Sequence, residues 1–229
     1  MNKNNFLFGI VGLIAGLAIG FYSANSINRN YQSTALANPA NAQFSDPQVQ
    51  NALVKDQPGS GGMMPGVSEA IDKAKNEPNN FEAQMKAGVM FLRINALDKA
   101  QPFFDQAAQL NPTKYEDLVN LGNAFFDIRQ YEKAEKWYEA ALKQKPDDTN
   151  VRTDYGITFV ERANPDLDRA IKEFQTSLKT NPKHEPTLYN LAVAYFKKGN
   201  ADEANKTLVL LEQSHPQSQL VNRLKQIIQ

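Results

Sequence analysis

The sequence predicts an all-α protein, a superhelical solenoid of helical hairpins that follows one apolar N-terminal segment and a linker. Prolines at 78, 112, 146, 182 and 216 recur with a nearly constant period of about 34 residues, and periods of this size are typical of solenoids. Glycines at 88, 122 and 156 recur with the same period. The third observation is an apolar run without any charge at residues 6–22, which read FLFGIVGLIAGLAIGFY.

The apolar run predicts a transmembrane anchor over residues 1–24. Extended through Ala24 as a helix, it is about 28 Å long at ~1.5 Å per residue, close to the ~30 Å hydrocarbon core of a bilayer. The alternative is a secretory signal peptide, whose apolar stretch is shorter and ends near a small-x-small cleavage site. Here Ala24-Asn25-Ser26 is a poor site, and the better Ala35-Leu36-Ala37 lies far beyond the run. We therefore expect membrane association through residues 6–24.

The charges around the run predict its orientation. Lys3 and the N-terminal amine precede it, and Arg29 follows. This distribution favours a single-pass protein of the bacterial inner membrane with its solenoid in the periplasm; a solenoid that faces the cytoplasm is the alternative.

Three glycines of the apolar run, Gly12, Gly16 and Gly20, lie four residues apart. They either pack two copies into a homodimer or reflect the general abundance of glycine in membrane helices.

Residues 25–66 predict a flexible linker. They are rich in Asn, Gln, Ser, Ala, Pro and Gly, and the stretch 58–62 reads PGSGG. Such a composition cannot bury enough apolar surface to order itself.

Residues 67–229 predict one domain of helical repeats. Apolar residues recur at i, i+3, i+4 and i+7 in two stretches of each period, first 81–94 and 97–110, then 115–128 and 131–144. The predicted repeats are 81–114, 115–148, 149–184 and 185–218, and the third has a two-residue insertion near Asn164-Pro165. A single helix over Val67–Lys75 precedes them. Residues 219–228 predict a C-terminal capping helix, because polar residues separate their apolar ones.

The residues at fixed places in each period resemble those of tetratricopeptide repeats. The first two units supply Ala87, Gly88, Phe91, Ala100, Phe104, Ala107 and Pro112, then Leu118, Leu121, Gly122, Phe125, Ala134, Tyr138, Ala141 and Pro146. The next two supply Tyr155, Gly156, Phe159, Ala170, Phe174 and Pro182, then Leu188, Leu191, Ala192, Tyr195, Ala204, Leu208, Leu211 and Pro216. The resemblance covers about residues 81–218 and implies hairpins whose two helices cross closely at the small residues.

The resemblance also implies a groove on the concave side of the solenoid, built mainly from the first helix of each hairpin. The positions expected to contact a bound protein segment are Met85, Val89, Leu92, Val119, Asn123, Phe126, Thr153, Ile157, Tyr189, Val193 and Phe196. This mostly apolar lining suits an amphipathic helix or an extended peptide. For each position the alternative is packing between repeats.

Chaperone-binding members of that family grip a terminal carboxylate with a clamp of Lys, Asn, Asn, Lys and Arg. The equivalent positions here are Met85, Val89, Asn120, Asn150 and Asp154, of which only Asn120 agrees. One repeat further along they are Val119, Asn123, Asp154, Pro186 and Asn190, of which only Asn123 agrees. The function of a cytosolic chaperone adaptor is therefore excluded for both registers.

The composition excludes further classes of function. The 25 Lys and Arg residues balance 25 Asp and Glu residues, so the chain lacks the basic excess of a nucleic-acid-binding protein. With no cysteine and two histidines, it has little material for a metal site or a catalytic triad. His184 and His215 lie near prolines and are expected on the surface. We expect no enzymatic activity, no cofactor and no metal.

The sequence thus predicts a membrane-anchored scaffold or adaptor that binds a peptide or a helix of a partner protein. The layout also resembles tetratricopeptide subunits of bacterial cytochrome c biogenesis, which join an N-terminal membrane helix to a few periplasmic repeats. That resemblance implies a role in the assembly or maturation of envelope proteins, with c-type cytochromes as one case. A structural protein that assembles with itself is the alternative.

Overall fold

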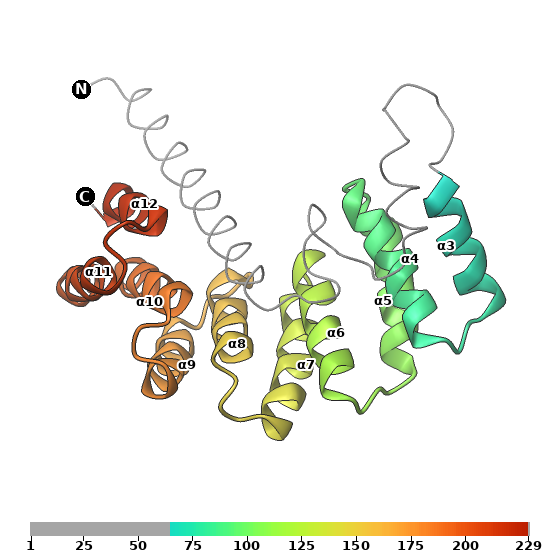
Figure 1. Cartoon of the computed structure of the whole chain (residues 1–229), viewed down its shortest axis with the longest axis horizontal. Coiled ribbons are helices and arrows are strands. Elements are labelled where there is room, and N and C mark those ends of the chain that lie inside the picture. The colour runs from blue at the N-terminus through green and yellow to red at the C-terminus, as the bar shows by residue number, and fades with distance from the viewer. Residues whose placement is uncertain (1–64, 229) are drawn as a thin grey trace, which may run out of the picture. The chain divides into compact units, whose positions relative to one another are not determined.

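Residues 65–228, which the computed structural model describes, form ten α-helices and no strand (Figure 1). They divide into two compact units, here called the N-terminal unit, residues 65–145, and the C-terminal unit, residues 146–228. The predicted anchor over 1–24, its glycine face and nearly all of the predicted linker lie outside the described residues. Within 65–228, no helix combines the length and the apolar character that crossing a membrane requires.

The N-terminal unit consists of a single helix followed by two hairpins. Its helices are α3 (Pro65–Asn76), α4 (Phe81–Arg93), α5 (Leu97–Gln109), α6 (Tyr115–Asp127) and α7 (Tyr131–Gln144). Each helix packs on the next along the chain, and α4 also contacts α6. The predicted hairpins are confirmed, whereas α3 begins two residues before its predicted start at Val67.

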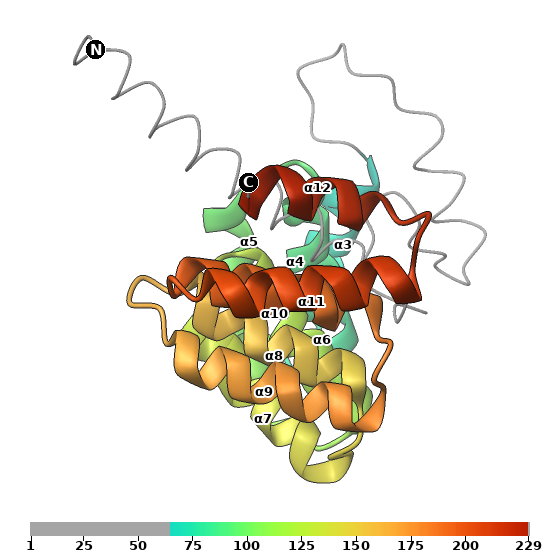
Figure 2. The ribbon, with the colours of Figure 1, turned by 90° about the vertical axis from the view of Figure 1, so that its left-hand side faces the viewer.

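The C-terminal unit contains two hairpins and a final helix. Its helices are α8 (Thr149–Glu161), α9 (Leu167–Thr180), α10 (Glu185–Lys197), α11 (Ala201–Ser214) and α12 (Gln219–Ile228). The central helix is α10, because it contacts all four others. Figure 2 looks onto α9, α11 and α12, which pack with α10. The last helix, α12, spans the residues predicted as the capping helix.

Small residues let the two helices of a hairpin cross closely, as predicted. A Cβ atom added at Gly88 would clash with the ring of Phe104. A Cβ atom added at Gly156 would stand 2.5 Å from the ring of Phe174. Both rings are completely buried. Each aromatic ring therefore fills the space that the missing glycine side chain leaves.

The turn inside a hairpin has a recurring backbone conformation. Asn95, Arg129 and Gly199 follow the first helix of their hairpins and adopt positive φ angles of 55°, 61° and 85°. The α8–α9 turn differs because it holds the inserted residues near Asn164. There Asp166 caps α9, since its Oδ1 accepts a hydrogen bond from the Arg169 backbone N–H at 3.0 Å.

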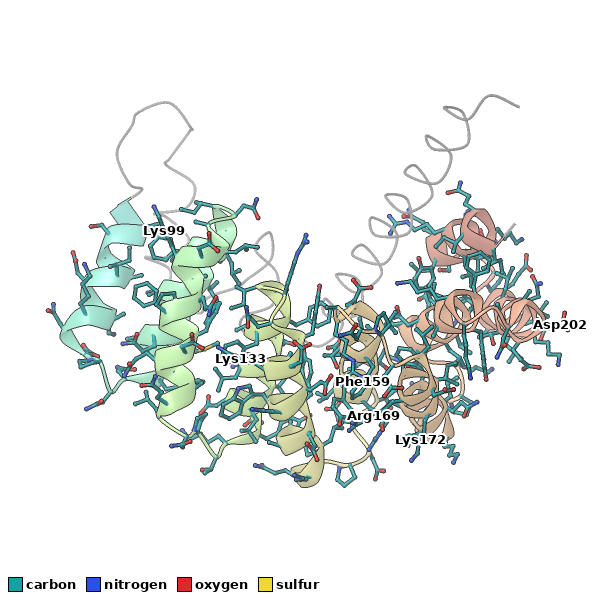
Figure 3. The ribbon with its side chains drawn as sticks, turned by 180° about the vertical axis from the view of Figure 1, so that it is seen from behind. Lys99, Lys133, Phe159, Arg169, Lys172 and Asp202 are labelled. Carbon is teal, nitrogen blue, oxygen red and sulfur yellow. The ribbon has the colours of Figure 1, made fainter. Side chains whose placement is uncertain are left out.

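A cation on α9 also joins the α8–α9 hairpin. The Arg169 guanidinium lies 4.4 Å from the centre of the Phe159 ring on α8 (Figure 3). The same guanidinium donates a hydrogen bond to the Tyr155 hydroxyl at 2.6 Å. These contacts hold the ends of α8 and α9 together at the longer turn.

Candidate functional site

The predicted groove residues lie on the first helices of the hairpins, and we call them the helix-A faces of the two units. In the N-terminal unit this face comprises Met85, Val89 and Leu92 on α4 and Val119, Asn123 and Phe126 on α6. Met85, Val89 and Phe126 are buried, whereas Leu92, Val119 and Asn123 are half-buried.

Two of these α6 residues contact the second helix of their own hairpin. The Phe126 ring packs edge-on against Tyr131 with ring centres 5.1 Å apart. Asn123 accepts a hydrogen bond from the buried Tyr138 hydroxyl at 2.7 Å. In this unit, Leu92 and Val119 are therefore the predicted groove residues with apolar surface left to offer a partner.

The helix-A face of the C-terminal unit comprises Thr153 and Ile157 on α8 and Tyr189, Val193 and Phe196 on α10. Phe196 is half-buried and the other four are completely buried. The C-terminal ends of the two helices are joined by an ion pair between Glu161 and Lys197 at 3.6 Å.

Thr153 belongs to a buried cluster of hydroxyl groups between α8, α9 and α10. Its Oγ1 lies 2.6 Å from Thr187 Oγ1 and 3.2 Å from Ser177 Oγ. It also donates to the Thr149 carbonyl oxygen at 2.7 Å. Because these contacts use the hydroxyl, Thr153 holds neighbouring repeats together in this structure.

His184 extends this hydroxyl cluster, which makes its prediction as a surface residue wrong. Its Nδ1 lies 2.6 Å from Thr187 Oγ1, and the side chain is half-buried. Burial lowers the pKa of His184 to about 4, although the negative charge of Asp148 opposes the shift. The imidazole is therefore neutral near pH 7 and acts as a hydrogen-bonding partner of the cluster.

The C-terminal unit contains buried polar atoms on α10 and α12. Tyr189 and Asn190 are both 0% exposed, and neither Tyr189 Oη nor Asn190 Oδ1 makes a hydrogen bond within the described residues. Arg223 on α12 likewise has a buried Nη1 without a partner there. Burial raises the pKa of Tyr189 to about 12, and the nearby positive charge of Arg223 partly opposes this shift.

Arg223 is not among the predicted groove residues, because those residues all belong to the four hairpins. The repeat period would have included it, since Arg223 lies one full period after Tyr189. Carrying the period into the capping helix places Arg223 at the equivalent position of the next helix. The helices that carry the two residues, α10 and α12, contact each other.

The described residues offer no metal-binding group. In residues 65–228, no three histidine, cysteine, aspartate or glutamate side chains gather closely enough to hold an ion.

Helical hairpins that recur at the fixed period of the sequence define a helical-repeat protein. The family model of the tetratricopeptide repeat matches residues 92–153 and 162–228, which together are more than half of the chain. The chain therefore belongs to the tetratricopeptide repeat family.

Several solved structures share this fold at low sequence identity. YrrB, described as a TPR protein with an unusual peptide-binding site, is 20% identical with a TM-score of 0.58, over 70% of this chain and 81% of YrrB. MamA is 21% identical with a TM-score of 0.55, over 66% of this chain and 86% of MamA. TTC0263 of Thermus thermophilus is 16% identical with a TM-score of 0.52, over 71% and 88% of the two chains. No curated protein sequence matches the chain.

Proposed function

We propose that this protein is a membrane-anchored scaffold that binds a peptide or a helix of partner proteins on its helix-A faces. One observation carries the proposal: Leu92, Val119 and Phe196 are apolar but remain half-buried on helices whose other apolar residues are mostly buried. Membership of the repeat family supports it, since stacked repeats create extended binding surfaces. The peptide-binding site named for YrrB supports it further. The protein acts by binding, without catalysis.

The partners that we propose are envelope proteins under assembly or maturation, and c-type cytochromes are one class among them. Residues 6–24 anchor the chain in a bacterial inner membrane, with the repeats in the periplasm. Anchoring raises the local concentration of the repeats near the membrane, so a modest affinity for a partner suffices.

Labelling of a single introduced cysteine tests this location. The chain has no cysteine, so Ser60→Cys gives one reactive site in the predicted linker. We expect a membrane-impermeant maleimide to label intact cells, with the full-length chain in the membrane fraction. Protection of the thiol until the cells are lysed would place the repeats in the cytoplasm, and a shortened chain in the soluble fraction would indicate a cleaved signal peptide.

Charged substitutions on the helix-A faces test binding. In Val119→Asp and Phe196→Asp, a carboxylate replaces a half-buried apolar contact, so we expect about a tenfold loss of co-purifying partner protein. The amounts are measured by quantitative mass spectrometry on full-length protein purified from membranes. Tyr189→Asp is unsuitable, because a carboxylate at this buried position would also unfold the unit.

The matched control is Leu210→Asp. Leu210 is 54% exposed on α11, which is the second helix of its hairpin. We expect this variant to retain its partners, and circular dichroism to show native helix content in all three variants. If Val119→Asp and Phe196→Asp are folded and still recover as much partner protein as the unmodified chain, the helix-A faces do not bind the partner.

A further inference from the structure

The contacts within the hydroxyl cluster of the C-terminal unit determine where its protons lie. Thr153 Oγ1 and Ser177 Oγ both donate to the Thr149 carbonyl oxygen, at 2.7 and 3.0 Å. A hydroxyl group carries one proton, so both oxygens can only accept in their remaining contacts. Thr187 Oγ1 lies 2.6 Å from Thr153 Oγ1 and therefore donates its own proton to that oxygen.

This order of protons fixes the tautomer of His184. Its Nδ1 lies 2.6 Å from Thr187 Oγ1, whose proton is already directed to Thr153. Thr187 can therefore only accept from the imidazole, so Nδ1 carries the hydrogen. In a neutral imidazole the other nitrogen, Nε2, is then unprotonated. A proton taken up in acid binds at Nε2 and leaves the bond from Nδ1 to Thr187 in place.

The position of His184 disfavours the positive charge that this proton brings. His184 is the N-cap residue of α10, and the partial positive charge at a helix N-terminus repels a cation. The side chain is also half-buried, so an imidazolium there loses part of the hydration that it has in water.

The groups around His184 come from each element that packs near it. Asp148, the N-cap residue of α8, attracts the imidazolium, whereas protonated His215, at the end of α11, repels it. The α9 helix contributes the uncharged Ser177 hydroxyl. On α10, the neighbouring Glu185 carboxylate accepts a hydrogen bond from the Ser218 hydroxyl of the next turn. Burial outweighs Asp148, since the pKa of His184 is lowered to about 4.

We propose that His184 and the hydroxyl cluster form an acid-sensitive contact that holds α10 to the α8–α9 hairpin at neutral pH and loosens when Nε2 takes up a proton. In an opened state water surrounds the imidazole, so the charged form is favoured there. The helices α8 and α10 carry the helix-A face of this unit, so acid opens the face that they form. The inference does not depend on the proposed function.

The expected pH range follows from the two pKa values of His184. The opened state binds more protons than the closed state between the ordinary value of 6.5 and the lowered value of about 4. The contact is therefore fully stable above about pH 6.5 and weakens as the pH falls toward 4.

Hydrogen exchange tests the inference on full-length protein in detergent, near pH 7 and near pH 5. Mass spectrometry follows peptides from α8 to α10, and peptides from α4 to α6 are the internal reference, because both histidines of the chain lie in the C-terminal unit. After correction for the intrinsic effect of pH on exchange, protection gives the equilibrium constant for opening. We expect this constant to rise about 10- to 20-fold in α8 to α10 between the two pH values, and much less in the reference helices.

Three variants identify the group that titrates. His184→Asn keeps a side-chain N–H donor for Thr187 but does not titrate, so the rise should disappear. His215→Asn is the matched control, because it removes the other histidine and should retain most of the rise. Asp148→Asn keeps the Oδ1 acceptor that caps α8 and removes the charge that attracts the imidazolium, so the rise should become larger. Circular dichroism near pH 7 checks that each variant is folded.

Two results would overturn the inference. One is an equal change in both units of the unmodified chain, and the other is a rise that survives in folded His184→Asn. If His184→Asn does not fold, Asp148→Asn decides, since an unchanged or smaller rise in this variant would show that His184 is not the titrating group.

Discussion

Phe174→Ala is expected to lower the free energy of unfolding of the C-terminal unit by about 3–5 kcal/mol. The Phe174 ring is completely buried and lies against Gly156 on the opposite helix of its hairpin. Truncation removes the transfer free energy of the ring and leaves a cavity, because Gly156 has no side chain that could fill it. Urea denaturation followed by circular dichroism measures the loss.

Leu210→Ala is the matched control for this prediction. Leu210 is a large apolar residue of the same unit but is 54% exposed. We expect a change of less than about 0.5 kcal/mol, as for most surface substitutions. Similar effects of the two substitutions would contradict the assignment of Phe174 as a central packing residue of its hairpin.

Gly122→Ala is expected to destabilise the N-terminal unit, although alanine is the better helix former. The added Cβ would stand 2.5 Å from two ring atoms of Tyr138, which is 0% exposed. The ring cannot swing away freely, because its hydroxyl is bonded to Asn123 Oδ1 at 2.7 Å. Overpacking of this kind costs about 1–3 kcal/mol, and the gain of about 1 kcal/mol in helix propensity offsets it only in part.

The second substitution Tyr138→Ala reveals the cause of that loss. Without the ring there is no clash, so Gly122→Ala should become neutral or stabilising in the Tyr138→Ala background. Urea midpoints of the four variants form a double-mutant cycle, and we expect a coupling free energy above about 1 kcal/mol. Additive effects would show that Gly122 is required for a reason other than its contact with Tyr138.

The repeat architecture could be predicted because its signals are local and recur. Proline and glycine spacings define the period, and the apolar pattern within each period distinguishes the two helices of a hairpin. Close crossing at Gly88 and Gly156 follows from residue size alone, since only a small residue allows an aromatic ring so near the helix backbone. The two-residue insertion was found in the same way and lies in the α8–α9 turn.

The candidate site was only partly predictable. The period places Met85 and Val119 at equivalent positions on their first helices, yet Met85 is buried and Val119 is half-buried. Periodicity gives the direction of a side chain around its helix. It does not give the accessibility of that side chain, which depends on everything that packs near it.

The sequence by itself determined the family, the period of the repeats and the crossing residues of this protein, because each depends on residues that are close along the chain or repeated at a fixed period. The tertiary structure decided which side chains have unused hydrogen-bonding atoms. Thr153 on α8 finds a partner in Thr187 on α10. By contrast, the buried Tyr189 Oη on α10 and the buried Arg223 Nη1 on α12 have no hydrogen-bond partner among the described residues. Hydrogen bonding between helices depends on their packing in three dimensions, which no local pattern in the sequence specifies.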